Sequence, residues 1–359
     1  MMHKERLEKD VFVQGEEDYH TYRIPSVVQA PDGTLIALAE GRRDNRGDPG
    51  NGHIDLVYKI SRDGGSSWSK RRFFDHSEEG WSASNPTAVV ERDSGRVFVL
   101  FNRWKPGCGG RNSRPGTLDN QLWLRYSDNN GETWSEAVDI TEQGRDVERW
   151  GKAVFGPGHG IQTADGRLVI PVNAPREKGD DLQNTASFAL YSDDKGQSWM
   201  RGEQIGRATD ENQIVELDDG RLLMDARQRG DDVPHRWNSV STDGGESWSP
   251  PREGQKVTKI CAGIIRCSQP GDTEKSFLLW SAPKGPGRRD LVLRISGDQG
   301  ASFPAETLVG SGPTAYSDLA ALDDGSVAIL WEGGEESLYE KITFSCISKE
   351  ELHRIAETV

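Results

Sequence analysis

Cysteine is scarce in this sequence, with four residues in 359, and the four are not spaced like metal ligands. Cys108, Cys261, Cys267 and Cys346 form no Cys-x-x-Cys pair and no zinc pattern with histidine, so we expect no structural metal. A chain of this length can bury a large core without disulfides. We therefore expect buried free thiols, with a Cys261–Cys267 disulfide as the remaining alternative.

Long apolar runs and an excess of positive charge are also missing. No stretch approaches the ~20 apolar residues that span a membrane, and Met1–Asp10 lacks the apolar core of a signal peptide. The formal net charge of −14 argues against nucleic acid or an anionic membrane surface as a partner, because both attract basic proteins. We expect a soluble protein, cytoplasmic or secreted with its leader removed. The sequence leaves the compartment and the oligomeric state open.

Convincing helical patterns are absent before the charged tail at 348–359, and a repeated turn takes their place. Five segments share a serine, an Asp or Asn two residues later, then a glycine, a hydroxyl residue and an aromatic, at 61–68, 127–134, 192–199, 241–248 and 296–303. The short polar side chain can hydrogen-bond its own backbone, and the glycine can take a positive φ. The pattern predicts a tight hairpin turn that is closed by an aromatic plug.

A second hairpin signal alternates with the first. Asp-Gly or Ser-Gly between apolar residues recurs near residues 32, 94, 165, 219 and 324, and most copies precede a buried-strand run such as Leu168–Val172. Each repeat thus supplies about four strands and two hairpins.

Four-stranded sheets at this period are typical of a β-propeller. We predict an all-β, six-bladed β-propeller that forms a single domain over residues 1–359. A strand near Asp10–Gln14 is expected to close the ring beside the last blade.

Arginines stand at strand ends around the expected axis of this ring. Arg23 enters the first blade, Arg227 ends an apolar run in the fourth, and Arg288 or Arg289 enters the fifth. A guanidinium can bind a carboxylate through two parallel hydrogen bonds, so three arginines from different blades could hold one carboxylate. The residues alone leave open whether they form a solvated rim or an anion-binding site.

The chain resembles the exo-α-sialidases of the bacterial and animal type. The repeated turns resemble the aspartate boxes of that family, and further motifs match in the family order over about residues 20–347, namely Tyr22–Pro25, Phe155–Gln162, Gln213–Leu217 and Gly312–Ser317. One aspartate box is a weak signal, whereas five boxes with distant motifs in order are specific. The resemblance implies a retaining exo-α-sialidase that hydrolyses terminal sialic acids through a tyrosine nucleophile.

The same resemblance implies a role for each matching residue. The substrate carboxylate would be held by an arginine triad, Arg23, Arg227 and Arg288. The other matching positions are Asp48 as acid/base, Tyr316 as nucleophile, Glu211 as the base that activates it, Glu332 as the residue that orients Arg23, and Arg42 beside the sugar's 4-position.

Three of these positions have close competitors in the sequence. Arg288 fits the family pattern Arg-x-Asn/Asp-Leu better than Arg289, and Glu211, unlike Asp210, directly precedes an apolar strand. Asp48 competes with Asp44 and Asp55, and its spacing from Arg42 fits the family. His159 receives no role.

The chemistry of the substrate gives a reason for a tyrosine. Sialic acid bears a carboxylate on its anomeric carbon, which would repel an attacking Asp or Glu. A neutral phenol is not repelled, provided that a neighbouring carboxylate takes its proton. Tyr316 with Glu211 supplies that pair, and Asp48 is the separate general acid. Two displacements at one carbon retain configuration, by analogy with other retaining glycosidases.

Alternative functions stay open at this stage. A relative with the same triad could act on deaminated sialic acid or Kdo, or transfer the sugar, and a propeller of another class could bind acidic glycans without turnover. The nucleophile and its base favour an enzyme, since a lectin needs neither. We expect a sialylated glycan or another 2-keto acid sugar as partner, and no metal or organic cofactor. Ser82–Pro86 and Asn102–Trp104 are expected to influence the C5 preference, and Trp81, Trp104, Trp150 and Trp237 could line a sugar subsite.

Overall fold

Strands make up nearly all the regular structure of the protein. The computed structural model describes residues 6–77, 79–176, 184–206, 208–229, 234–267 and 276–357. Within these ranges the two helices are the short α1 (Thr141–Gly144) and α2 (Lys349–Ala356), which begins the charged tail. The predicted all-β class is confirmed. None of the helices in these ranges has the length and apolar character needed to cross a membrane.

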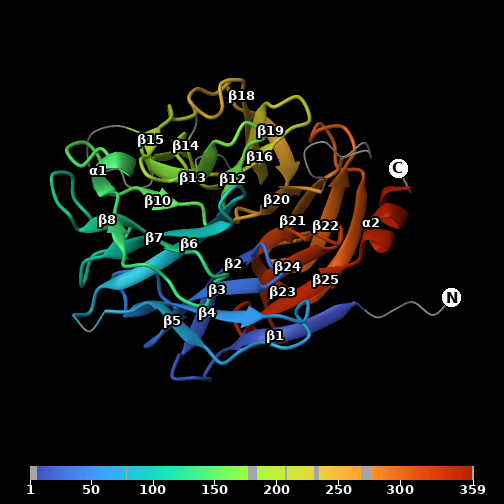
Figure 1. Cartoon of the computed structure of the whole chain (residues 1–359), viewed down its shortest axis with the longest axis horizontal. Helices are drawn as coiled ribbons and strands as arrows, with labels where there is room; N and C mark the ends of the chain where they lie inside the picture. The colour runs from blue at the N-terminus through green and yellow to red at the C-terminus, as the bar shows by residue number, and fades with distance from the viewer. Residues whose placement is uncertain are drawn as a thin grey trace.

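The strands of the described ranges form five sheets that follow one another along the chain (Figure 1). The first contains β2 (Thr21–Gln29), β3 (Leu35–Arg42), β4 (Ile54–Ser61) and β5 (Arg72–Asp75). The second contains β6 (Ser82–Glu91), β7 (Arg96–Trp104), β8 (Asn120–Ser127), β9 (Val138–Asp139) and β11 (Gly158–His159). The third contains β10 (Val154–Phe155), β12 (Ile161–Gln162), β13 (Leu168–Pro175), β14 (Thr185–Ser192) and β15 (Met200–Arg201).

The fourth and fifth sheets contain the strands from β16 onward together with β1. The fourth contains β16 (Thr209–Glu216), β17 (Leu222–Gln228), β18 (His235–Ser241) and β19 (Arg252–Lys256). The fifth has seven strands, β20 (Gly263–Arg266), β21 (Leu278–Pro283), β22 (Arg289–Ser296), β23 (Ala305–Ala321), β24 (Val327–Gly333), β25 (Lys341–Ile347) and β1 (Leu7–Val13).

The long strand β23 belongs to two halves of the seven-stranded sheet. Its first part pairs with β22, from Ala305 opposite Ile295 to Pro313 opposite Arg289, and its second part pairs with β24. The sheet therefore divides into β20–β23 and a second group of β23, β24, β25 and β1. The strand expected near Asp10–Gln14 is β1, which pairs antiparallel with β25.

The first strand of each group contacts its neighbours in the adjoining groups. β2 contacts β6 and β23, β12 contacts β6 and β16, β16 contacts β20, and β20 contacts β23. These strands therefore bring side chains from different sheets together.

The five repeated turns have a common hydrogen-bond network, and each joins the third strand of a group to the fourth. In the first copy Ser61 Oγ donates to Asp63 Oδ1 over 2.8 Å and accepts from Gly65 N over 2.9 Å, while Asp63 Oδ1 accepts from Ser67 N over 2.9 Å. In the second copy Asn129 Oδ1 takes the carboxylate's place and accepts from Thr133 N over 3.0 Å. The turn type predicted for these segments is therefore present.

The two glycines of the first turn allow a matched test of this packing. Gly65 has φ +90°, and a Cβ there would lie 2.1 Å from the ring of Phe344, whereas a Cβ at Gly64, with φ +66°, would meet nothing within 4 Å. We expect Gly64→Ala to lower the free energy of unfolding by about 1 kcal/mol, and Gly65→Ala by a further ~1–3 kcal/mol because it adds a clash to the strain. Urea unfolding checks this, and equal losses would contradict it.

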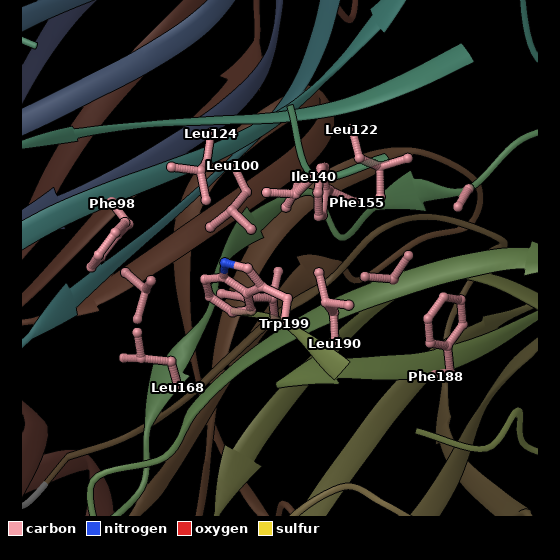
Figure 2. Close-up of a cluster of buried hydrophobic side chains, with 14 of the residues drawn as sticks. Phe98, Leu100, Leu122, Leu124, Ile140, Phe155, Leu168, Phe188, Leu190 and Trp199 are labelled. Atoms are coloured by element: carbon pink, nitrogen blue, oxygen red, sulfur yellow. The ribbon is translucent and has the colours of Figure 1, made fainter. Parts of the chain in front are cut away.

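Buried apolar side chains fix neighbouring sheets against one another. Figure 2 shows one cluster, between the second and third sheets, in which Trp199 from the third repeated turn packs among Leu100, Leu168 and Leu190. Trp199 is 4% exposed, so it acts as the aromatic plug that the sequence predicts. Because the sheets cannot slide, the residues on their first strands keep fixed positions.

All four cysteines lie within the described residues, and all are free thiols. The alternative prediction of a Cys261–Cys267 disulfide is therefore wrong. Cys261 is buried as expected, whereas Cys108, Cys267 and Cys346 are partly exposed.

Candidate active site

A cavity of about 730 Å³ opens where the first strands of several sheets meet. Seven of the eight predicted site residues line it, namely Arg23, Arg42, Asp48, Glu211, Arg227, Arg288 and Tyr316. The eighth, Glu332, is fully buried and bonds Arg23. Arg23 and Tyr316, which are 293 residues apart in sequence, thus reach the same cavity.

β-Bulges interrupt the first strands beside this cavity. Register shifts occur at 23–26 in β2, 84–87 in β6, 209–212 in β16 and 314–317 in β23. A bulge bends its strand and re-aims side chains, and here the bulges contain or adjoin Arg23, Glu211 and Tyr316. Ile24 has φ 60°, an unusual value for a β-branched residue. The conformation is held by the hydrogen bond of 2.7 Å that its backbone N–H donates to Glu332.

Glu332 positions two elements of the cavity at once. Its carboxylate accepts hydrogen bonds from Arg23 Nε at 2.7 Å and Arg23 Nη2 at 3.3 Å. It also accepts from the backbone N–H of Tyr316 at 3.1 Å. Burial acts to lower the pKa of Arg23, but the charge and hydrogen bond of Glu332, together with Tyr339 and Tyr316, outweigh burial and raise that pKa.

Tyr316, Glu211 and Arg227 form a closed hydrogen-bonded group. The hydroxyl of Tyr316 donates to Glu211 Oε1, and Arg227 Nη1 donates to Glu211 Oε2 and, over 2.9 Å, to the Tyr316 hydroxyl. Burial and the charge of Glu211 raise the pKa of Tyr316 well above its usual value. Burial also acts to raise the pKa of Glu211, but Arg227 and the hydrogen bond from Tyr316 outweigh it and lower that pKa. The resting pair is therefore a neutral phenol bonded to a carboxylate.

Asp210, the neighbour of Glu211, is turned toward other partners. Its Oδ2 lies 2.7 Å from Arg229 Nη2, and its Oδ1 lies 3.8 Å from Arg227 Nε. Burial raises the pKa of Asp210, and the adjacent Glu211 adds to the increase. Among these two carboxylates, Glu211 is the one that bonds the Tyr316 hydroxyl.

Arg288 and Arg289 point to different surroundings. Arg288 is half-buried, lines the cavity, and donates from Nη1 to the Tyr339 hydroxyl over 2.9 Å. Arg289 is exposed and does not line the cavity. The arrangement agrees with the choice of Arg288.

Tyr339 is a cavity residue that the sequence analysis missed. Its ring centroid lies 4.0 Å from Arg23 Cζ, and the Tyr316 ring centroid lies 5.2 Å from the same atom. The two aromatic rings and Glu332 therefore hold the Arg23 guanidinium. Tyr339 lies between β24 and β25 and matches no motif, so no sequence signal identifies it.

The loop between β3 and β4 supplies Asp48. Arg42 is buried, contacts Asp48 Oδ1 over 3.1 Å and bonds Glu40 Oε2 through Nε at 2.9 Å and Nη2 at 2.6 Å. The side chain of Asp48 is 79% exposed at the edge of the cavity. Of its two competitors, Asp55 is fully buried and Asp44 accepts from His53 N, and neither lines the cavity.

The remaining wall combines expected and unexpected residues. Asn85 and Trp104, from the two segments expected to affect the C5 preference, line the cavity, whereas Trp81, Trp150 and Trp237 do not. Lys152 also lines it and had no sequence signal. Burial, with a smaller effect of the nearby Arg229, lowers the pKa of Lys152 to about 8.

His159 lies outside this cavity. Its Nδ1 is 2.6 Å from Asp318 Oδ1, and both side chains are buried. The pair connects β11 with β23, which agrees with leaving His159 without a role in the site.

Comparisons with known proteins agree along nearly the whole chain. Residues 25–329 match the family model described as a BNR repeat-like domain. The chain is 32% identical over 347 residues to a sialidase of Micromonospora viridifaciens, covering 91% of this chain and 52% of that protein. It is 28% identical over 418 residues to Sialidase-3 of Rattus norvegicus, covering 96% of this chain and 95% of that protein.

Solved structures give the same result. The Hadza microbial sialidase Hz136 matches with a TM-score of 0.84 and 27% identity, covering 94% of this chain and 67% of that one. The chain spans about half the length of the Micromonospora relative. The family match extends over more than half of this chain, and bacterial and mammalian sialidases align with it almost throughout, so the chain belongs to the sialidase family.

Proposed function

We propose that this protein is a glycoside hydrolase, a retaining exo-α-sialidase that removes terminal α-ketosidic sialic acids with Tyr316 as nucleophile. The observation that carries the proposal is the group Tyr316–Glu211–Arg227 in an arginine-lined cavity. Named sialidases that align with most of the chain support the hydrolase class.

The fold proposed for this function is a single domain, a six-bladed β-propeller over residues 1–359. The division of the fifth sheet at β23 supports a count of six groups, and the contacts between first strands support a ring. The cavity would then lie on the axis of that ring.

Binding begins with the substrate carboxylate. Arg23, Arg227 and Arg288 come from three different sheets or their loops and line one cavity. Their guanidinium groups can donate paired hydrogen bonds to one carboxylate, which fixes the anomeric carbon above Tyr316. Because Glu332 and two tyrosine rings hold Arg23 in place, little ordering of that side chain remains to be paid on binding.

Attack then follows from the hydrogen bond already in place. As the Tyr316 oxygen bonds to the anomeric carbon, its proton passes to Glu211. Arg227 contacts both residues and stabilises the negative charge that develops on the phenol oxygen.

Asp48 gives a proton to the departing glycosidic oxygen and then takes one from the attacking water. Its exposed position allows exchange with solvent between the two steps. The second displacement, at the same carbon, returns the original configuration.

A substrate panel tests the function. Aryl α-ketosides of N-acetyl, N-glycolyl and deaminated sialic acid and of Kdo are assayed, and proton NMR follows the first anomer formed. We expect release of the α-anomer from sialic acid. Binding without turnover of any substrate would show that the protein is a glycan-binding protein and not an enzyme. Cleavage of the deaminated sugar or of Kdo alone would assign a substrate other than sialic acid. An anhydro-sugar product would indicate intramolecular transfer.

Arg288 and its neighbour form a matched pair of variants. We expect Arg288→Ala to lower kcat/KM by about 10²-fold or more, because it removes one carboxylate-binding guanidinium from the cavity. Arg289→Ala removes an exposed side chain outside the cavity and should change kcat/KM less than about threefold. Steady-state kinetics measure kcat/KM for both variants. A larger loss of kcat/KM for Arg289→Ala would overturn the assignment of Arg288 as a carboxylate-binding residue.

A further inference from the structure

A second polar cluster lies outside the cavity, at the base of the loop that carries Asp48. It consists of His53, Asp55 and His76, whose nearest ligand atoms all lie within 4.8 Å of one another. His53 Nε2 lies 2.9 Å and His76 Nδ1 lies 2.8 Å from the same atom, Asp55 Oδ1. The Asp55 side chain is fully buried, whereas the imidazoles are 18% and 31% exposed, so an ion can reach them from solvent.

The hydrogen bonds of His76 conflict with one another. Its Nδ1 faces Asp55 Oδ1, which only accepts, and also lies 3.2 Å from Arg43 Nη2, which only donates. If Nδ1 carries a proton, it faces the donor Arg43 Nη2 with a second donor. If Nδ1 carries no proton, two acceptors, Nδ1 and Asp55 Oδ1, lie 2.8 Å apart. A cation that is coordinated by the imidazole nitrogens and by Oδ1 gives these acceptors a common positive partner, so they no longer oppose one another.

The other oxygen of Asp55 is already held. Oδ2 accepts from the Tyr19 hydroxyl over 2.7 Å and from Arg43 Nε over 2.8 Å. Such outer partners fix the orientation of a ligating carboxylate and leave its second oxygen for a metal. Arg43 bonds Oδ2 through Nε, but its Nη2 lies 3.2 Å from His76 Nδ1, so its positive charge weakens the affinity for a cation.

We propose that His53, Asp55 and His76 bind a Zn²⁺ ion. Two imidazole nitrogens and one carboxylate oxygen suit Zn²⁺, whereas Ca²⁺ and Mg²⁺ prefer oxygen ligands. Water would complete the tetrahedron on the exposed side. The spacing of the three residues matches no zinc motif, because His76 reaches the others only through the pairing of β5 with β4.

The position of the ion would link it to the loop between β3 and β4. Arg43 N donates to His53 O over 3.1 Å, and His53 N donates to Asp44 Oδ2 over 3.1 Å, so these residues form the neck of the loop. Asp48 lies midway between Arg43 and His53. Bound Zn²⁺ joins this neck to the end of β5 and restricts the loop. The binding itself does not depend on the proposed function.

Calorimetry on the full chain, stripped with a chelator, tests the site. We expect one equivalent of Zn²⁺ to bind, no response to Ca²⁺, and visible d–d absorption when Co²⁺ replaces Zn²⁺. His76→Ala, which alters a partly exposed side chain, should weaken binding at least about tenfold, and so should Tyr19→Phe, which removes an outer partner. His353→Ala, at an exposed position of α2, is the control and should not change it.

Two results would overturn the site. One is that the unaltered protein binds no Zn²⁺, and the other is that both His76→Ala and His53→Ala keep the original affinity and cobalt spectrum. Circular dichroism and melting temperature of each variant separate a lost ligand from a lost fold.

Discussion

We expect Tyr316→Phe to lower kcat/KM by at least about 10³-fold while the fold stays intact. The substitution removes one oxygen, the atom that donates to Glu211 and accepts from Arg227. The ring remains, with its contacts to the guanidinium groups of Arg23 and Arg288. Glu211 and Arg227 still pair with each other, so no buried charge loses its partner.

Tyr339→Phe is the matched control for that measurement. It also removes a phenolic hydroxyl from the cavity, but that hydroxyl accepts a hydrogen bond from Arg288 and, among the described residues, makes none with Tyr316 or Glu211. We expect a loss of about tenfold, the value of one hydrogen bond to a charged group. Assays on a fluorogenic α-ketoside compare the two variants. If Tyr316→Phe lost no more than Tyr339→Phe, Tyr316 would not be the nucleophile.

Glu332→Ala has the largest expected effect on stability, a loss of about 3–5 kcal/mol in the free energy of unfolding. Glu332 and Arg23 are almost completely buried, with side chains 0% and 7% exposed, so removing the carboxylate leaves a buried cation without its counterion. The backbone N–H groups of Ile24 and Tyr316 lose their acceptor as well. Urea unfolding followed by tryptophan fluorescence measures the loss.

An exposed ion pair supplies the comparison for Glu332. Asp93 and Lys195 lie 2.7 Å apart with side chains 68% and 56% exposed. Asp93→Ala should cost less than about 1 kcal/mol, because solvent screens the pair. A similar small loss for Glu332→Ala would show that Arg23 finds another partner or that water enters the site.

Motifs identified the residues whose chemistry is tied to a local pattern. Arg23 follows a tyrosine at a strand start, Glu211 comes shortly before the apolar residues of β16, and Tyr316 lies in a Gly-Pro-x-x-Tyr-Ser segment. All three line the cavity. The repeated turns were equally predictable, because serine, aspartate and glycine form their bonds within eight residues.

Residues placed by distant contacts could not be predicted in this way. Tyr339 and Lys152 enter the cavity from segments with no repeat or motif. The bulges at 23–26 and 314–317 depend on Glu332, which accepts backbone hydrogen bonds from both strands. The continuity of β23 was also hidden, because the repeat pattern assigns separate strands to each repeat and does not show that one strand can serve two groups. In each case the position of the residue or strand depends on contacts between segments that lie far apart in the sequence.

The pairing of β1 with β25 sets an order for events during synthesis. Leu7 lies opposite Cys346, so β1 leaves the ribosome long before its partner exists. At the ~5–20 residues per second of translation, the delay is roughly 20–70 s. During that time the exposed side chains of Glu8, Lys9 and Asp10 keep the strand charged, which discourages pairing with other strands. The pairing of β1 with β25 can therefore form only after β25 has left the ribosome.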